Sequence, residues 1–144
     1  MGGPSPRQLT QQALESGRGI VRLMPTWVPR SFCIPGRRLR LHPDDLYALG
    51  GQRGGIDERW FASTTPADNG PGTPADEGLS YIFVDEGHRV TLREAMDAFA
   101  VDFLGQEAVE RYGGWVMYSK FFDNMYALPI HLHQNDARAA DVGM

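Results

Sequence analysis

The strongest structural signal in the sequence is the segment from Thr91 to Gly113, which carries both a helix start and a helix stop. Thr91 and Glu94 form a capping box, in which two side chains satisfy the first free amides of a helix. Apolar residues then recur at helical spacing, at Leu92, Met96, Phe99 and Phe103. Gly105 divides the segment, so we expect two helices, the second spanning residues 106–112 and stopped by a left-handed Gly113.

Helical and strand-like patterns are segregated along the rest of the chain. A short helix is predicted for residues 7–17 and a helix start for residues 42–46, whereas strand-like residues fill 20–23, 31–41, 115–118 and 125–133. Residues 64–78, rich in glycine and proline, predict a long loop that either covers a site or moves freely at the surface.

This order favours a mainly β domain with α segments (α+β) over alternating βαβ units. We expect residues 1–18 to form a flexible leader and a short helix, and residues 19–144 to belong to one domain.

Charge and composition exclude several classes of partner. The net charge of −4 gives no positive field that would attract nucleic acid or anionic lipid. No stretch approaches the ~20 apolar residues that a membrane helix needs, and the first residues lack the apolar core of a signal peptide. Cys33 is the single cysteine, so no intrachain disulfide can form. We therefore expect a cytoplasmic protein with no nucleic-acid or membrane partner.

The residues that carry chemistry are His131 and His133. In a strand, residues two apart share a face, so both imidazoles can reach one metal ion at about 2.0–2.1 Å. Imidazole suits zinc, iron, nickel and copper alike. Alternatively, the pair is two half-buried histidines on a polar face. A stable site also wants a third ligand, and Asp136 could serve only if a turn aimed it back.

The stretch RYGGWVMYSKFFDNMYALPIHLHQND, from Arg111 to Asp136, resembles a segment of the type I mannose-6-phosphate isomerases of the cupin superfamily. Without a gap, Lys120 falls on the strand lysine of the family, His131 on its glutamine ligand and His133 on its histidine ligand.

Two upstream stretches extend the resemblance over residues 55–142. VTLREAMDAFAVDFLGQEAVERYG is similar to the helical segment of the family, and DERWFASTTPADNG, with Glu58, Trp60 and Ser63, is similar to its early ELW element.

The resemblance implies a cupin-like β-sandwich or jelly roll holding one zinc ion, and a metal-dependent aldose–ketose isomerase of a sugar phosphate (mannose-6-phosphate/fructose-6-phosphate type). It assigns His131 and His133 as metal ligands and Lys120 as a catalytic residue that contacts phosphate or moves a proton, although a lone lysine is otherwise a solvated surface charge. The sequence departs from the family because His131 replaces glutamine. The remaining family ligands, a glutamate and a histidine, come from strands beyond residue 144, so we expect an incomplete, N-terminal portion of the fold.

Two alternatives stay open. One is a non-catalytic, cupin-like sugar-binding or regulatory module. The other is an iron-dependent dioxygenase on the same scaffold, because His131 in place of glutamine makes the donor set richer in nitrogen.

Overall fold

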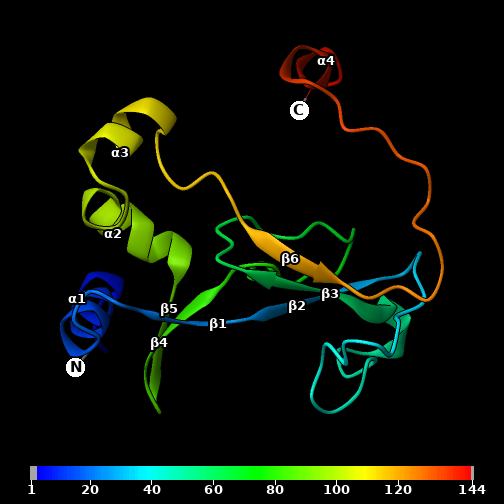
Figure 1. Cartoon of the computed structure of the whole chain (residues 1–144), viewed down its shortest axis with the longest axis horizontal. Helices are drawn as coiled ribbons and strands as arrows, with labels where there is room; N and C mark the ends of the chain where they lie inside the picture. Colours follow the sequence, from blue (N-terminus) through cyan, green and yellow to red (C-terminus); the bar gives the residue numbers. More distant parts are fainter. Residues whose placement is uncertain (1–2, 144) are drawn as a thin grey trace.

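The computed structural model describes residues 3–143, arranged as two groups of elements along the long axis of the molecule (Figure 1). Its elements are α1 (Pro6–Ser16), β1 (Arg22–Met24), β2 (Thr26–Arg30), the 3-10 helix η1 (Gly51–Arg53), β3 (Gly55–Phe61), β4 (Tyr81–Asp85), β5 (His88–Thr91), α2 (Leu92–Leu104), α3 (Gln106–Tyr112), β6 (Ser119–Phe122) and α4 (Asp136–Asp141). Two antiparallel sheets form, in the orders β1-β4-β5 and β2-β3-β6. The predicted α+β class is confirmed.

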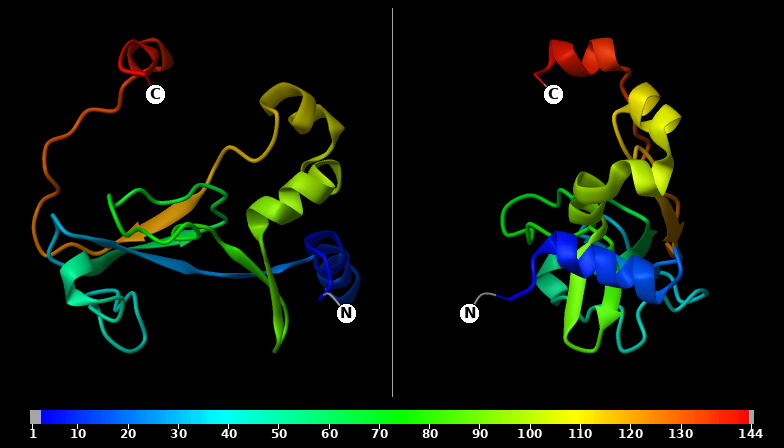
Figure 2. Two further views of the ribbon diagram at one scale, coloured as in Figure 1. Left: turned by 180° about the vertical axis from the view of Figure 1, so that it is seen from behind. Right: turned by 90° about the vertical axis from the view of Figure 1, so that its left-hand side faces the viewer.

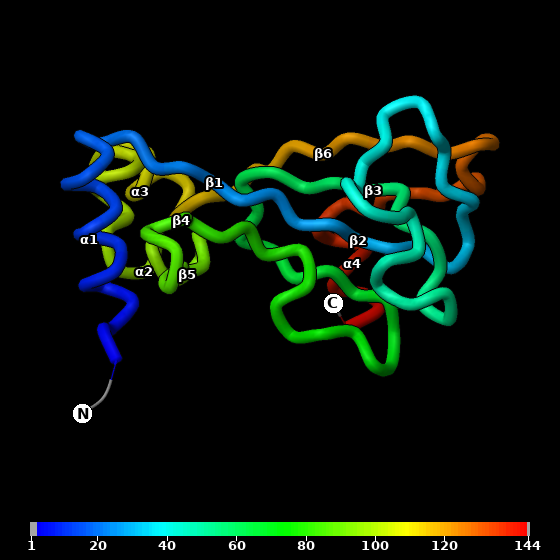
Figure 3. Tube along the Cα trace, turned by 90° about the horizontal axis from the view of Figure 1, so that it is seen from below, coloured from blue at the N-terminus to red at the C-terminus, as the bar shows by residue number. Residues whose placement is uncertain are grey.

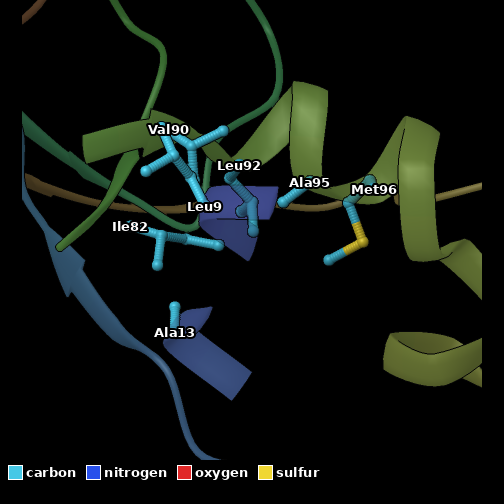
Figure 4. Close-up of a cluster of buried hydrophobic side chains, with 7 residues drawn as sticks. All are labelled: Leu9, Ala13, Ile82, Val90, Leu92, Ala95 and Met96. Carbon is cyan, nitrogen blue, oxygen red and sulfur yellow. The ribbon is translucent and has the colours of Figure 1, made fainter. Parts of the chain in front are cut away.

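The first group, here called the helical half, packs α1 and α2 against the sheet β1-β4-β5 (Figures 1 and 2). Spacing of three and four residues turns one stripe of each helix inward. Figure 4 shows the resulting core, to which α1, the sheet and α2 all contribute: Leu9, Ala13, Ile82, Val90, Leu92, Ala95 and Met96. Burial of each large side chain contributes about 1.5–3 kcal/mol, which makes this core the main source of tertiary stability in the half.

The predicted helices of this half are confirmed. The Thr91 hydroxyl accepts a hydrogen bond from the Glu94 amide at 3.1 Å, and Glu94 accepts one from the Thr91 amide at 3.0 Å. Gly105 and Gly113 adopt positive φ angles of 81° and 75°, which end α2 and α3 where the sequence predicted. Phe99 departs from the predicted stripe, because a kink at φ −141° turns its ring under the Arg7 guanidinium group, 4.5 Å away.

The second group, here called the charged sheet, consists of β2, β3 and β6. Pro29 has no amide hydrogen, which suits an edge strand, and the register shifts between Val28 and Pro29. Apolar burial is small here, since the apolar cluster holds Val28, Trp60 and Ala67. Seen from below, β6 runs along the opposite edge of this sheet from β2 (Figure 3).

Besides the segment after β6, three predicted elements are absent from the described residues. Residues 31–41 form a loop instead of a strand, and residues 42–46 form turns instead of a helix start. The buried Asp123 carboxylate holds the loop of residues 31–41 by accepting a hydrogen bond from the Leu39 amide at 2.7 Å. Gly36 is required there, because a Cβ atom would lie 1.9 Å from the Asp123 carboxylate. In the third case, residues 115–118 are irregular and the strand starts at Ser119.

Beyond β6 the chain leaves the body and continues to α4, which stands apart from the other elements in the left-hand view of Figure 2. Residues 125–133 were predicted as a strand, and this is wrong: they have no regular secondary structure and pair with no strand of the described part. A jelly roll has about eight strands in two packed sheets, so the six strands of residues 3–143 do not make one, and the cupin fold stays a prediction.

The N-terminal segment is only partly described. Helix α1 begins at Pro6 with Ser5 as its N-cap, as residues 7–17 predicted, and Met1 and Gly2 of the expected leader lie outside the described residues, as does Met144. No helix within residues 3–143 has the length and apolar character needed to cross a membrane.

Candidate active site on the charged sheet

Glu58 is the centre of the most densely hydrogen-bonded cluster on the charged sheet. Its side chain is buried in β3, and one carboxylate oxygen accepts a hydrogen bond from Arg30 Nε at 2.8 Å. The other accepts from Trp60 Nε1 at 2.6 Å and from Lys120 Nζ at 3.2 Å. One buried carboxylate thus faces two cations and an indole.

Strand geometry explains why these groups meet. Glu58 and Trp60 are two residues apart and share a face of β3, and Lys120 of β6 lies directly opposite Trp60. Arg30 reaches the same face from the end of β2. Burial alone would raise the pKa of Glu58, but hydrogen bonds from Arg30 and Trp60 and the nearby positive charges outweigh it and lower that pKa. Glu58 is therefore ionised at neutral pH.

Lys120 sits among aromatic rings. Its ammonium nitrogen lies 4.5 Å from the centre of the Phe122 ring, 5.3 Å from that of Trp60 and 5.8 Å from that of Tyr118. Trp60 and Tyr118 are themselves stacked, with ring centroids 4.7 Å apart. Ring faces attract a cation without accepting its protons, so Lys120 keeps N–H donors for a further anion.

The cluster forms one wall of a cavity of about 820 Å³. Much of the remaining lining comes from the segment after β6. The lining residues are Arg30, Phe32, Glu58, Tyr118, Lys120, Phe122, Leu128, Pro129, His131 and His133. The structure thus brings together all three residues that the sequence singled out for chemistry.

His131 and His133 have adjacent rings, with centroids 5.1 Å apart and planes inclined by 71°. Two imidazoles bound to one tetrahedral zinc at about 2.0–2.1 Å would have centroids about 5 Å apart, so the donor pair fits the ion in spacing. Nδ1 of His131 lies 2.8 Å from the Pro129 carbonyl oxygen. A proton on Nδ1 would donate to that oxygen and leave Nε2 for a metal.

A third metal ligand is not found within residues 3–143, where no three His, Cys, Asp or Glu side chains are grouped closely enough to hold an ion. Asp136, the ligand considered from sequence, begins α4 and does not line the cavity. In a strand, Ile130 and Leu132 would alternate with the two histidines and point to the opposite face. Instead they are fully exposed, at 103% and 92%, because no second layer covers them in the described part of the chain.

The predicted long loop, residues 64–78, is tied to the site. Arg30 Nη1 donates to Asn69 Oδ1 at 2.5 Å, and Asn69 Nδ2 donates to Glu77 Oε1 at 2.6 Å. Arg53 forms an ion pair with the same Glu77. These contacts anchor the loop to the charged sheet, which disfavours a free surface excursion. None of its residues lines the cavity, so a cover over the site stays a prediction.

Sequence reasoning did not select Arg30, Phe32 or Asp57. Asp57 is fully buried beside the Cys33 thiol, and burial is the main reason its pKa rises to about 6. Burial also raises the pKa of Cys33, to about 11, so this thiol is not a nucleophile at neutral pH. The run of three charged residues Asp57, Glu58 and Arg59 within a strand was the available signal, because buried carboxylates cost free energy unless neighbouring groups pair with them.

Comparison with known proteins finds no match to the chain among family models, curated proteins or solved structures.

Proposed function

We propose that this chain carries the site of a metal-dependent aldose–ketose isomerase acting on a sugar phosphate of the mannose-6-phosphate/fructose-6-phosphate type. The observation that carries the proposal is one cavity that Lys120, His131 and His133 line together. Its volume of about 820 Å³ lies within the ~300–1,000 Å³ typical of small-molecule sites. Such a reaction needs an anion contact, a proton carrier and an electrophile close together.

Lys120 is the group available to the substrate. All three guanidinium nitrogens of Arg30 are engaged by Glu58, Asp68 and Asn69, whereas Lys120 makes one hydrogen bond, to Glu58. Glu58 is ionised and already accepts from three side chains, so it serves as a positioning residue. Lys120 would hold the phosphate as a point charge or carry the proton between the two sugar carbons.

His131 and His133 would hold the metal ion. A bound divalent ion supplies Lewis-acid polarisation of the sugar carbonyl, and zinc or iron suits imidazole donors. The second candidate is a non-catalytic sugar-binding or regulatory module, which the aromatic rings of Phe32, Tyr118 and Phe122 in the same cavity would also suit. We assign the proposed activity to the cytoplasm, in line with a single cysteine.

The metal assignment is tested by zinc content. Purified protein equilibrated with zinc and desalted is expected to retain about one ion per chain, and the His131→Ala/His133→Ala variant is expected to lose it. The matched control is His42→Ala/His88→Ala, which removes two imidazoles that do not line the cavity. A double variant at 131 and 133 that keeps its metal rules the ligand assignment out.

Turnover separates the candidate functions. With added zinc, interconversion of mannose 6-phosphate and fructose 6-phosphate supports the isomerase, whereas saturable binding without turnover supports the binding module. Oxygen consumption with added iron would instead support a dioxygenase. Lys120→Arg keeps the positive charge, so it should preserve KM while lowering kcat if Lys120 carries the proton. Lys120→Met should impair both if Lys120 also holds phosphate.

A further inference from the structure

Strand β6 has a free edge with its hydrogen-bonding groups in register for another strand. β6 pairs with β3 on one side, and no strand within residues 3–143 pairs with its other side. The Asp123 amide donates to the Asp57 carbonyl at 2.9 Å, so this residue pair is a hydrogen-bonded one. Because hydrogen-bonded and non-hydrogen-bonded pairs alternate along an antiparallel ladder, the amide and carbonyl groups of Lys120 and Phe122 point to the free edge.

Large apolar side chains lie exposed on β6 and on the segments that flank it. Ten are exposed between residues 116 and 132: Val116, Met117, Tyr118, Phe121, Phe122, Met125, Tyr126, Leu128, Ile130 and Leu132. At the roughly 60–120 Å² per fully exposed side chain implied by 1.5–3 kcal/mol at 25 cal/mol/Å², and with exposed fractions of 37–103%, they offer on the order of 500 Å². That total matches the apolar share of a standard interface, which buries about 800 Å² per partner, roughly 60% of it apolar.

The edge is complementary to itself in one register. Across a two-fold axis, antiparallel strands place residues of the same face opposite each other, so the axis can pass through Lys120 or Phe121. An axis at Lys120 would set two ammonium groups against each other. An axis at Phe121 pairs the two half-exposed Phe121 rings and sets Lys120 opposite the partner's Phe122. In this register the free amide and carbonyl groups of Lys120 and Phe122 bond to the partner strand.

We propose that two copies of this chain pair through antiparallel β6 strands centred on Phe121, which joins their charged sheets into one six-stranded sheet. A second copy is the occupant because it supplies, in the same register, both the missing hydrogen-bonding edge and an apolar surface of equal size. This inference does not depend on the proposed function.

The association state tests the proposal. Sedimentation equilibrium of the full chain at about 50 μM is expected to give twice the mass of one chain. Phe121→Glu puts two carboxylates across the axis and is expected to weaken dimerisation at least tenfold. Val101→Glu is the control, since Val101 is similarly exposed, at 48%, but lies on α2. A monomeric parent protein, or a Phe121→Glu variant that dimerises normally, overturns the proposal.

The register is tested by cross-linking in a Cys33→Ser background. Opposed Phe121 positions would have Cα atoms about 4.5 Å apart, within disulfide range, so Phe121→Cys should give a covalent dimer when diamide takes up the two thiol protons and electrons. Phe122→Cys should not, because its counterpart lies diagonally at about 7–8 Å. Cross-linking through residue 122 but not 121 overturns this register, and cross-linking through neither overturns the pairing.

Discussion

The two halves of this chain bury different kinds of side chain. The helical half buries seven apolar side chains in one cluster. The charged sheet buries carboxylates instead, with Asp57, Glu58 and Asp123 all at most 3% exposed beside a small apolar cluster. Apolar burial stabilises a fold directly, whereas a buried charge costs free energy unless it is paired. The helical half therefore supplies the stability, and the charged sheet keeps groups that are costly to bury and able to do chemistry.

The largest expected effect is found by comparing a fully buried isoleucine of the helical half with a fully exposed one outside both halves. Ile82→Ala removes a fully buried side chain from the helical half and is expected to lower the free energy of unfolding by about 2–5 kcal/mol, through lost transfer energy and a cavity. Ile130→Ala makes the same chemical change at a residue that is 103% exposed in the single chain, and should change stability by less than about 0.5 kcal/mol at a protein concentration too low for dimerisation. Urea unfolding of both variants checks the contrast. Equal losses would show that Ile130 is covered in solution.

The next effect concerns the pairing of charge on the sheet. Glu58→Gln keeps the shape of the side chain but leaves Arg30 and Lys120 without their carboxylate. We expect a loss of about 3 kcal/mol, at the lower end for a broken buried pair, because the Lys120 side chain is 29% exposed and partly screened.

The control for Glu58→Gln is Asp141→Asn, which breaks the exposed Arg138–Asp141 pair and should cost under about 0.5 kcal/mol. Thermal unfolding of the two variants compares them. Equal stability of Glu58→Gln and the parent would mean that the buried cluster contributes nothing net.

The features that could be predicted from the sequence follow the same division between the two halves. Helices α2 and α3 are local structures, since a capping box, an apolar stripe and two glycines specify them within about twenty residues, and their ends fall where the sequence predicted. Pairing between strands is non-local. Residues 31–41 and 125–133 have strand-like composition but find no partner strand in the described part of the chain, and composition alone could not reveal that.

The candidate site divides in the same manner. The spacing of His131 and His133 is a local pattern, and the structure sets the two rings side by side although the segment is not a strand. Arg30 comes from a strand 28 residues before Glu58, and its role depends on the register of β2 against β3. A strand register that includes a shift at Pro29 cannot be predicted from a single sequence.

The pH dependence of folding stability should distinguish Asp57 from the paired carboxylates. Its pKa is about 6 in the folded protein against 3.8 ordinarily, so between these values the folded state holds more protons than the unfolded state. Stability from this residue is therefore highest below about pH 4 and falls as the pH rises to about 6. Asp57→Asn removes the cost of burying the charge, and is expected to stabilise the protein by about 3 kcal/mol at pH 7.5 and hardly at all at pH 4.

Urea unfolding of Asp57→Asn and the parent at the two pH values measures this difference. The exposed Asp44→Asn is the control and should show no such pH-dependent gain. A stability loss at pH 7.5 on replacing Asp57 would mean that its carboxylate is paired with a cation in solution.

The smallest effect compares two helix caps. The Thr91 hydroxyl caps α2, whose buried stripe is part of the main core, so Thr91→Ala should lower the free energy of unfolding by about 1 kcal/mol and Thr91→Ser should restore most of it. Asn135 caps α4 by the same kind of hydrogen bond, to the Arg138 amide at 3.0 Å, but α4 has six residues and buries none of them.

A helix that short gains its stability from packing or not at all. Asn135→Ala should therefore leave the global unfolding midpoint within about 0.5 °C of the parent, whereas Thr91→Ala should lower it by about 3–5 °C. Differential scanning calorimetry of both variants decides the point. A cost at Asn135 comparable to that at Thr91 would show that α4 is folded onto the body or onto a second copy, and would overturn the division between a packed helical half and an unsupported C-terminal segment.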